Sequence, residues 1–494
     1  MNKHIVKALL FGAVALGGLT SCELDQYPET SLPTGQTWQK LSDAASYNVG
    51  LKSAVRSICG GIYAEKPDLQ SDLFNMTTAN STSAIYQLQD WTFESASGMG
   101  DGLWSTCYAV ISNANNIINN IDKINVEEGS QDEVDRNYYK GSAYFVRALA
   151  YDKLARRFCK AYDKATADQT LGLPLVTSID VNAKPARASL KATYDLIKED
   201  IKQAKELMGE NDVHNADYSQ ISYNTADALD ARISLNCQDY DNAIACAERT
   251  IGKYALCSTA DDFADMWQND EGSEIIFQPA QTKDERTNSY DAYIAFSTAN
   301  NGYNPDFVPT QGLIDLYEGS DIRQYTYFAA TGAVTSDIYD ENVIIFNKYP
   351  GNPALVKTSP QTEFYNMTKE LRVGEMYLIA AEASYMKDGS GLSYLNALRS
   401  KRGATALNLS GAQLFSQIKD EWARETCGEG FRLDCLKRWG DGCHRMAAQQ
   451  LTDGFLRNDP NYLNLNVPAT DKHFVWELPQ NDTQANTNLQ KNWQ

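Results

Sequence analysis

The stretch ELRVGEMYLIAAEASY, Glu370 to Tyr385, decides the fold of this chain of 494 residues. Its apolar and small residues recur at helical spacing, and the turn DGSG follows at 388–391. The next segment, LNALRSKRGA at 395–404, again places leucine and alanine on one side of a helix. Two helices separated by a Gly-rich turn indicate an α-helical hairpin.

A second segment of the same kind is TADALDARISLNCQDYDNAIACAERTI, residues 225–251, with a turn at 238–240. Small side chains would let its two helices approach closely: Ala228, Ala231, Ala243 and Ala247. Two further pairs are expected, 103–121 with 138–158 and 190–208 with the hairpin at 225–251. Hairpins that recur in this way are typical of tetratricopeptide repeats. Another kind of α-hairpin protein remains the alternative.

Long stretches without clean periodicity separate the helical pairs. Residues 65–101 and 264–360 are rich in Asn, Gly, Ser, Thr, Pro and aromatic side chains. Loops of this length inside a compact chain are usually functional. We therefore expect a mostly α protein, with tetratricopeptide-like hairpins as scaffold, long irregular loops and few short strands.

The deciding stretch resembles the signature of the SusD/RagB family of outer-membrane nutrient-binding lipoproteins. That signature is Arg-x-x-Glu-x-Tyr-Leu-x-x-Ala-Glu-Ala, followed by Leu-Asn-x-x-Arg-x-Arg-Gly. It falls on these residues: Arg372, Glu375, Tyr377, Leu378, Ala381, Glu382, Ala383, Leu395, Asn396, Arg399, Arg402 and Gly403. IKDEWARETCGEGFRLDCLKRWG at 418–440 resembles the family's next conserved stretch, with Cys435 in place of Leu and Trp422 in place of Arg.

The resemblance extends over nearly the whole length, through FVRALAYDKLARRF at 145–158, GLPLV at 172–176 and the helix at 187–207. It implies an α-helical body with four tetratricopeptide-like hairpins, docked on a SusC-like TonB-dependent transporter. The opposite, loop-built surface would capture an oligosaccharide or, in some branches of the family, a peptide. It implies no catalysis and no cofactor.

The N-terminus has the parts of an export signal. Lys3 and Lys7 form a basic start, residues 8–19 are apolar, and LTSC at 19–22 closes the segment. The apolar run is shorter than the roughly 20 residues of a membrane span. LTSC resembles a lipobox, which predicts lipidation of Cys22; an ordinary signal peptide with an accidental cysteine is the alternative. We expect a signal peptide at 1–21, a lipid-anchored tether at 22–40 and a single domain at 41–494. The resemblance places this domain at the outer membrane, facing the cell exterior.

Charge and composition exclude some partners. The formal charge is −20, and removal of Lys3 and Lys7 with the leader makes it −22. Nucleic acid is therefore a poor partner. Nine cysteines remain beside Cys22, without a C-x-x-C pair, and the chain has four histidines. Buried free thiols are favoured over a disulfide, and no metal site is expected.

The signature charges alternate in sign on helices expected to pack together, which suits ion pairs. They are Glu375, Glu382, Arg399, Arg402, Arg432 and Asp434. The sequence contains no Gly-x-Ser-x-Gly or His-Glu-x-x-His motif, so we do not expect an enzyme. Two other classes stay open: an anchored glycan-degrading enzyme and a tetratricopeptide-type assembly adaptor.

Candidate ligand-binding residues lie in two aromatic, Asn-rich segments of the long loops. Segment 72–93 contributes Asp72, Asn75, Tyr86 and Trp91. Segment 289–307 contributes Tyr290, Tyr293, Asn301 and Tyr303. Sugars stack their apolar faces on aromatic rings and pair their hydroxyls with amides and carboxylates. If the two segments meet in space, they would form one open face for a saccharide.

Overall fold

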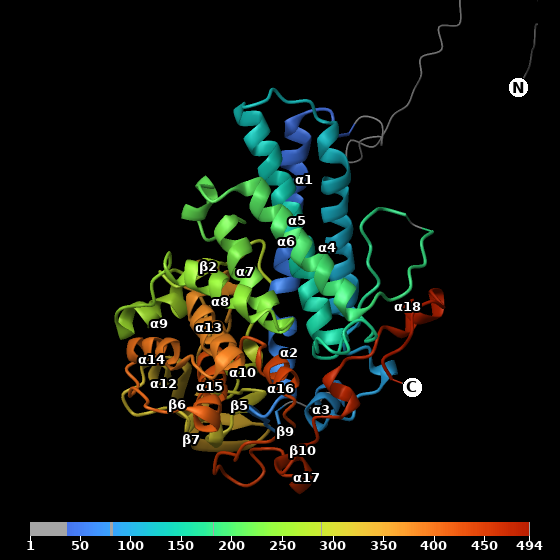
Figure 1. The fold of residues 1–494 in the computed structure, drawn as a ribbon. Coiled ribbons are helices and arrows are strands. Elements are labelled where there is room, and N and C mark those ends of the chain that lie inside the picture. Colours follow the sequence, from blue (N-terminus) through green and yellow to red (C-terminus); the bar gives the residue numbers. More distant parts are fainter. Residues whose placement is uncertain (1–36, 80–82, 181, 288, 494) are drawn as a thin grey trace, which may run out of the picture.

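The computed structural model describes residues 37–79, 83–180, 182–287 and 289–493. The predicted signal peptide and Cys22 lie outside these ranges. Long helices form one end of the molecule, and short helices and strands form the other (Figure 1). No helix in the described ranges is both long and apolar enough to cross a membrane.

The helical pairs form as the sequence predicts. In chain order they are α4 (Asp101–Asn120), α5 (Gln131–Phe158), α6 (Leu190–Met208), α7 (Tyr223–Asn236), α8 (Tyr240–Ile251), α13 (Val373–Asp388) and α14 (Leu392–Lys401). Each helix from α4 to α8 packs on the next, and α8 packs on α13, although more than a hundred residues separate those two helices in sequence. The scaffold of helical hairpins is thereby confirmed.

Three helices that the hairpin pattern did not delimit complete the scaffold. α1 (Leu41–Cys59) packs along α4 and α5, while α15 (Gly411–Thr426) packs on α13 and on α16 (Arg432–Trp439). One side of α1 is apolar and buried, with Leu51, Val55 and Ile58 inside the main core. The helical core therefore extends from the beginning of the described chain to its last third.

The remaining elements are short and lie mostly at the other end of the molecule. The helices are α2 (Ile62–Gln70), α3 (Ser83–Asp90), α9 (Ala260–Asn269), α10 (Asp291–Ile294), α11 (Gln311–Ile314), α12 (Ile322–Tyr327), α17 (Pro460–Leu463) and α18 (Gln480–Ala485). The 3₁₀ helices are η1 (Ser95–Ser97), η2 (Ile121–Lys123), η3 (Val213–Ala216), η4 (Pro353–Leu355) and η5 (Lys472–Phe474).

Most strands have only two or three residues. They are β1 (Phe74–Met76), β2 (Ile275–Phe277), β3 (Phe296–Ser297), β4 (Gly302–Tyr303), β5 (Phe307–Pro309), β8 (Leu371–Arg372), β9 (Cys443–His444) and β10 (Asn466–Val467). β6 (Phe328–Thr335) and β7 (Ile338–Phe346) are longer and form an antiparallel hairpin. The four-stranded sheet has the order β3-β4-β6-β7, and three two-stranded pairs join β1 to β5, β2 to β8 and β9 to β10. The stretch 264–360, expected to be irregular, therefore contains one regular hairpin.

Buried ion pairs account for the signature charges, as predicted. Glu425 on α15 is fully buried and accepts hydrogen bonds from Arg323, Arg372 and Arg402. The Arg402 Nη2 to Glu425 Oε1 distance is 2.6 Å. Burial alone would raise the pKa of Glu425, but the three guanidinium groups outweigh it and hold the pKa well below its usual range.

Other signature residues pair across helices in the same way. These pairs are Glu375 with Arg232, Glu382 with Arg438, Arg399 with Glu421 and Arg432 with Asp72. Asp434 accepts from Arg156 and Arg157. Burial favours the neutral Asp434 carboxyl, yet these two arginines lower its pKa to about 2. Arg432 and Asp434 are thus paired as expected, but only Asp434 is buried, whereas Arg432 stays partly exposed.

The cysteines of the described ranges are buried free thiols, as favoured from the sequence: Cys59, Cys107, Cys159, Cys237, Cys246, Cys257, Cys427, Cys435 and Cys443. Burial raises the pKa of Cys435 and of Cys443 to about 12, so both stay protonated at neutral pH. These thiols behave as small apolar side chains.

Gly374, in the first turn of α13, tests the importance of the Glu425 cluster. A Cβ at this position would lie 2.6 Å from Glu425 Oε1 and also collide with Arg372. Gly374→Ala should therefore lower the free energy of unfolding by about 2–3 kcal/mol, measured by urea denaturation. Gly50→Ala is the matched control, because it lies inside α1 with no neighbour within 4 Å of a Cβ. That control should be neutral or stabilising by up to about 1 kcal/mol; equal effects of the two changes would contradict the steric argument.

Candidate functional site

The two aromatic, Asn-rich segments meet at the end of the molecule opposite the long helices. Strand β1 of the first pairs antiparallel with β5 of the second, so that Met76 faces Phe307. Beyond the strands, the Thr77 N–H donates to Asp306 O at 2.9 Å and the Thr77 hydroxyl donates to Pro305 O at 2.7 Å. The segments therefore come together as the sequence-based hypothesis requires.

The aromatic rings at this junction face inward, however. The prediction that they form an open ligand-binding face is therefore wrong. Tyr290 and Tyr293 are each 1% exposed. The Tyr293 ring packs against Phe74 and Phe346 with centroids 4.9 and 5.0 Å apart, and Tyr290 stacks on Tyr349 at 3.8 Å. These rings form the core that joins the two segments.

Trp91 is also part of the core. Its side chain is 4% exposed, its indole N–H donates to Gln70 O at 2.7 Å, and its ring meets Phe474 edge-on at 4.6 Å. The backbone of Trp91 has a positive φ of 56°, at the point where α3 ends. The hydrogen bond and the packing hold the ring under α3, away from the surface.

The two polar candidates of the first segment are buried as well. Asp72 is 4% exposed and receives two hydrogen bonds from Arg432, at 2.8 Å from Nε and 2.7 Å from Nη2. Asn75 is fully buried within β1. The Asp72 carboxylate neutralises a largely buried guanidinium, which gives it a structural role that its place in a polar loop did not reveal.

Three candidates remain at the surface: Tyr86, Asn301 and Tyr303. Tyr86 is half-buried, and the Arg457 guanidinium lies 4.7 Å from its ring centroid. Arg457 is itself held by Asp90 through hydrogen bonds of 2.8 and 2.7 Å. Asn301 is exposed in the β3–β4 connection, and half-buried Tyr303 meets Phe296 edge-on at 5.5 Å.

The structure adds Tyr339, which the sequence reasoning missed. Its side chain is 61% exposed on β7, opposite Val334 of β6. The ring lies directly over Gly332: a Cβ added to this glycine would be 3.0 Å from the ring carbon Cζ. The run VIIF at 343–346, rich in β-branched and aromatic residues, was the available signal for a strand, but it lay in a stretch predicted to be loop.

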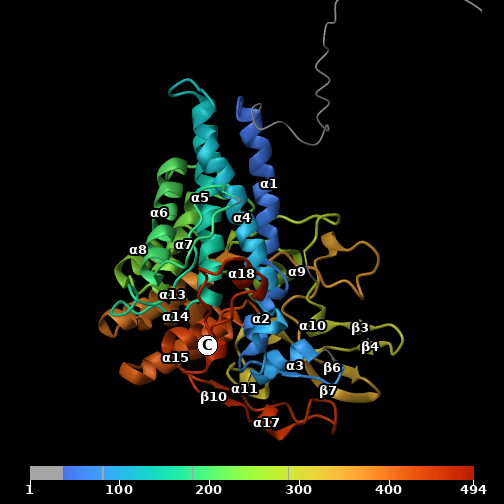
Figure 2. The same cartoon turned by 90° about the vertical axis from the view of Figure 1, so that its right-hand side faces the viewer.

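We call the surface formed by α3, the β3–β4 hairpin and the β6–β7 hairpin the loop face. These elements lie on one side of the molecule, below the long helices (Figure 2). The Ser336 hydroxyl, at the tip of the β6–β7 hairpin, donates to Thr78 O, and Thr335 and Thr78 share a hydrogen bond of 3.1 Å. The hairpin is thus tied to the segment before α3, and the loop face is a connected surface with rings, amides and hydroxyls.

A carboxyl beneath this junction has an unusual environment. Glu65 on α2 is 5% exposed, and its Oε1 has no hydrogen-bond partner among the described residues. Burial, reinforced by the negative charges of Asp291 and Asp306, raises the pKa of Glu65 to about 8. Its carboxyl group is therefore neutral over most of the physiological pH range.

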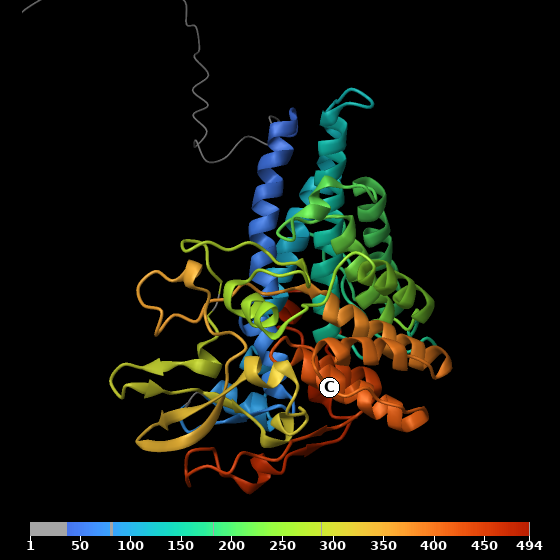
Figure 3. The ribbon, with the colours of Figure 1, turned by 90° about the vertical axis from the view of Figure 1, so that its left-hand side faces the viewer.

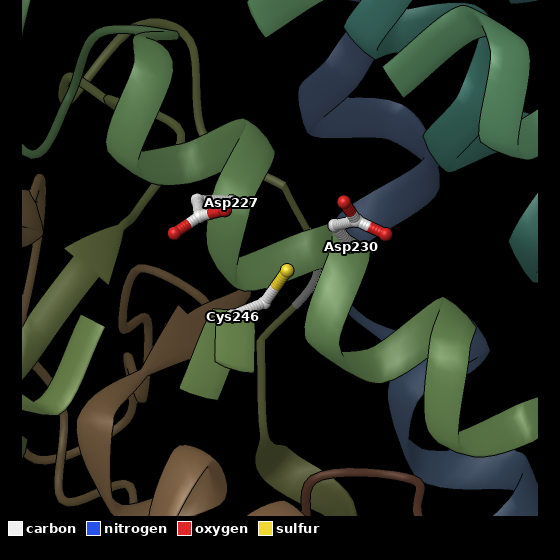
Figure 4. A group of neighbouring side chains, drawn as sticks. All are labelled: Asp227, Asp230 and Cys246. Carbon is white, nitrogen blue, oxygen red and sulfur yellow. The ribbon is translucent and has the colours of Figure 1, made fainter. Parts of the chain in front are cut away.

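A different group of acids could be mistaken for a metal site. Asp227 and Asp230 of α7 and Cys246 of α8 bring possible ligand atoms within 4.8 Å of one another (Figure 4). Lys205 lies 2.6 Å from Asp230, and Arg249 donates to Asp227 at 2.6 and 3.0 Å. Protein cations therefore neutralise both carboxylates, and we interpret the cluster as an ion-pair network that joins α6, α7 and α8.

Comparison with known proteins agrees with this architecture. Residues 5–235 match a protein family described as starch-binding and associating with the outer membrane, and residues 265–494 match the SusD family. SusD-like protein P2 from Formosa agariphila is 22% identical over 459 residues, which are 86% of each chain.

Solved structures of similar proteins share the fold. A SusD superfamily protein from Bacteroides thetaiotaomicron aligns with a TM-score of 0.75 and 22% identity, over 92% of this chain and all of that chain. A SusD superfamily protein from Bacteroides vulgatus gives 0.74 and 24%, over 92% and 99% of the two chains. A SusD-like carbohydrate binding protein from Bacteroides vulgatus gives 0.74 and 22%, over 91% and 97%.

The burial of the candidate rings has a measurable consequence. Trp91→Ala and Tyr293→Ala should each lower the free energy of unfolding by about 3–5 kcal/mol, because each leaves a cavity in the core. Tyr339→Ala should change it by no more than about 0.5 kcal/mol, since the ring is mostly exposed. Urea denaturation of the three variants tests this, and a small effect at Tyr293 would show that its ring is on the surface.

Proposed function

Because the chain belongs to the SusD/RagB family, we propose that it is a cell-surface nutrient-binding protein that captures an oligosaccharide on its loop face. The observation that carries this proposal is the exposed Tyr339 ring on β7, in the same four-stranded sheet whose β3–β4 connection exposes Asn300 and Asn301. A flat ring accepts the apolar face of a sugar, and neighbouring amides and hydroxyls pair with its hydroxyl groups. A peptide ligand remains the alternative occupant of the same surface.

The route to the cell surface is part of the proposal. The lipobox-like LTSC segment would place a lipid on Cys22, and several acyl chains on one residue would anchor the chain stably in the outer membrane. The helical body would then dock on a SusC-like TonB-dependent transporter, which receives the ligand from the loop face. The SusD/RagB resemblance supports both steps.

A glycan-degrading enzyme is the second candidate, and one observation favours it. Glu65 has the raised pKa that a general acid of a glycosidase requires. Its carboxyl group, however, is 5% exposed and lies under the junction of the two segments, where a glycosidic oxygen has little access. Incubation with polysaccharides should therefore release no products; oligosaccharide release that Glu65→Gln abolishes would favour the enzyme.

Loss of the exposed ring should weaken glycan binding. The test uses the purified chain with a panel of neutral and acidic oligosaccharides on an array, followed by calorimetry with the glycan that binds. Tyr339→Ala should lower the affinity about fivefold to tenfold, the loss of about 1–1.4 kcal/mol of stacking. Tyr47→Ala, which removes an exposed ring of α1 stacked on Trp38, should not change it. Equal glycan affinities of the Tyr339 variant and the wild type would contradict the proposal that the loop face binds the glycan. Binding to the transporter without any glycan binding would instead favour an adaptor role.

The anchoring proposal has its own test. Cys22→Ala should abolish labelling by a radioactive fatty acid and release the protein from the outer-membrane fraction of cells that lack the transporter. The soluble chain should keep its far-UV circular dichroism spectrum, because Cys22 precedes α1 by nearly twenty residues. Retention of the variant in that fraction would contradict lipidation as the anchor.

A further inference from the structure

A groove separate from the loop face lies between α9 and α12. It has a volume of about 380 Å³ and continues along Asn347 and Pro350, just after β7. α9 and α12 lie next to each other near the centre of the view in Figure 3. Pockets for small ligands have volumes of about 300–1,000 Å³, so this groove is large enough for a short stretch of a sugar chain.

One wall of the groove carries an exposed aromatic ring in a fixed position. Tyr325 on α12 is 72% exposed, and its hydroxyl donates to Gly319 O at 2.8 Å. On the opposite wall, α9 contributes the small side chains of Ala260 and Ala264 together with the carboxylates of Asp261 and Asp265. An exposed tyrosine alone is ordinary, but this ring is anchored at its polar end beside an open groove.

The groove also has hydrogen-bonding groups that lack protein partners. The Asp261 carboxylate makes no ion pair with a described residue. Gln268 donates its amide N–H to Gly351 O, while its carbonyl oxygen accepts no hydrogen bond from the residues that the structure describes. Trp267 lines the groove, is 1% exposed, and its indole N–H has no partner within the described ranges. That indole N–H is itself buried, so the groups open to a ligand are the Asp261 carboxylate and the Gln268 carbonyl oxygen.

The charge of the lining restricts the class of ligand. Asp261 and Asp265 line the groove, and none of the described residues that line it is Lys, Arg or His. A uronic acid or a sulfated sugar would meet only like charge. Carboxylates are strong acceptors for hydroxyl groups, so a sugar without acidic groups fits these side chains.

From these observations we propose that the groove between α9 and α12 is a second saccharide-binding site, for a neutral oligosaccharide stacked on Tyr325. The proposal rests on the proposed function, since both sites would take parts of the same polymer. α12 continues directly into β6, and the strand from Phe328 to Val334, next to Tyr339, spans about 20 Å at 3.3 Å per residue. A long chain that occupies both sites gains avidity because the second contact becomes intramolecular.

The test uses the purified chain and four neutral polysaccharides, amylopectin, xylan, glucomannan and laminarin, with polygalacturonate as the acidic comparison. Tyr325→Ala should lower the affinity for the neutral polysaccharide that binds by at least fivefold. Tyr325→Phe, which keeps the ring, should stay within about threefold of the wild type. The combined Tyr325→Ala and Tyr339→Ala variant should bind more weakly than either single variant. Thermal unfolding of Tyr325→Ala should match the wild type, because the ring is mostly exposed.

The other outcomes separate the two proposals. If Tyr325→Ala leaves the affinity unchanged while Tyr339→Ala weakens binding, the groove is not a saccharide-binding site, but the proposal for the loop face still holds. Binding of polygalacturonate that depends on Tyr325 would overturn the assignment to neutral sugars. Absence of binding to all five polysaccharides by the wild type would overturn both sites as saccharide sites.

Discussion

The ion pairs of a single buried carboxylate, that of Glu425, are the interaction on which the second half of the molecule depends. Its oxygens meet guanidinium groups from α12, β8 and the end of α14, and its own helix is α15. Four elements thus converge on one carboxylate. The removal of one partner from such a buried cluster leaves uncompensated charge, which is costly, whereas the intact cluster fixes one arrangement of its elements. The packing of β8, α14 and α15 on α13, with α12 joined to them through Arg323, follows from this constraint.

Ion pairs also orient α13 itself. Nearly every side chain from Val373 to Ser384 is buried, so this helix has no solvent-facing stripe that would set its rotation. Glu375 pairs with Arg232 on α7, and Glu382 pairs with Arg438 on α16. Because the two carboxylates have partners on different sides, they define one rotation of the helix. We infer that the signature charges contribute specificity of packing more than net stability.

The sequence predicted the scaffold and the roles of the signature charges, because both depend on short-range patterns. Helical periodicity is visible within a window of about 11–18 residues, and the pairs α4–α5 and α7–α8 show it. The candidate site was less predictable. Tyr290 and Tyr293 are buried by Tyr349 and Phe346, which follow more than fifty residues later, so loop composition alone cannot separate a core ring from an exposed one. Tyr339 is exposed because it lies on the outer side of a hairpin that the sequence reasoning took for loop.

The pairing of β1 with β5 has a consequence for the order in which the chain assembles. Thr77 and Pro305 are 228 residues apart, and Thr78 bonds to Gly454 over 376 residues. The α-helical hairpins need only neighbouring segments and fold quickly, whereas contacts of such sequence separation form late because loop closure is entropically costly. The edge of β1 that faces β5 therefore stays open until residues 307–309 pair with it, and the bond from Thr78 to Gly454 requires the C-terminal segment as well. The surface proposed to bind sugar is therefore completed only after distant segments have come together, and until then its unpaired strand edges are exposed to misassociation.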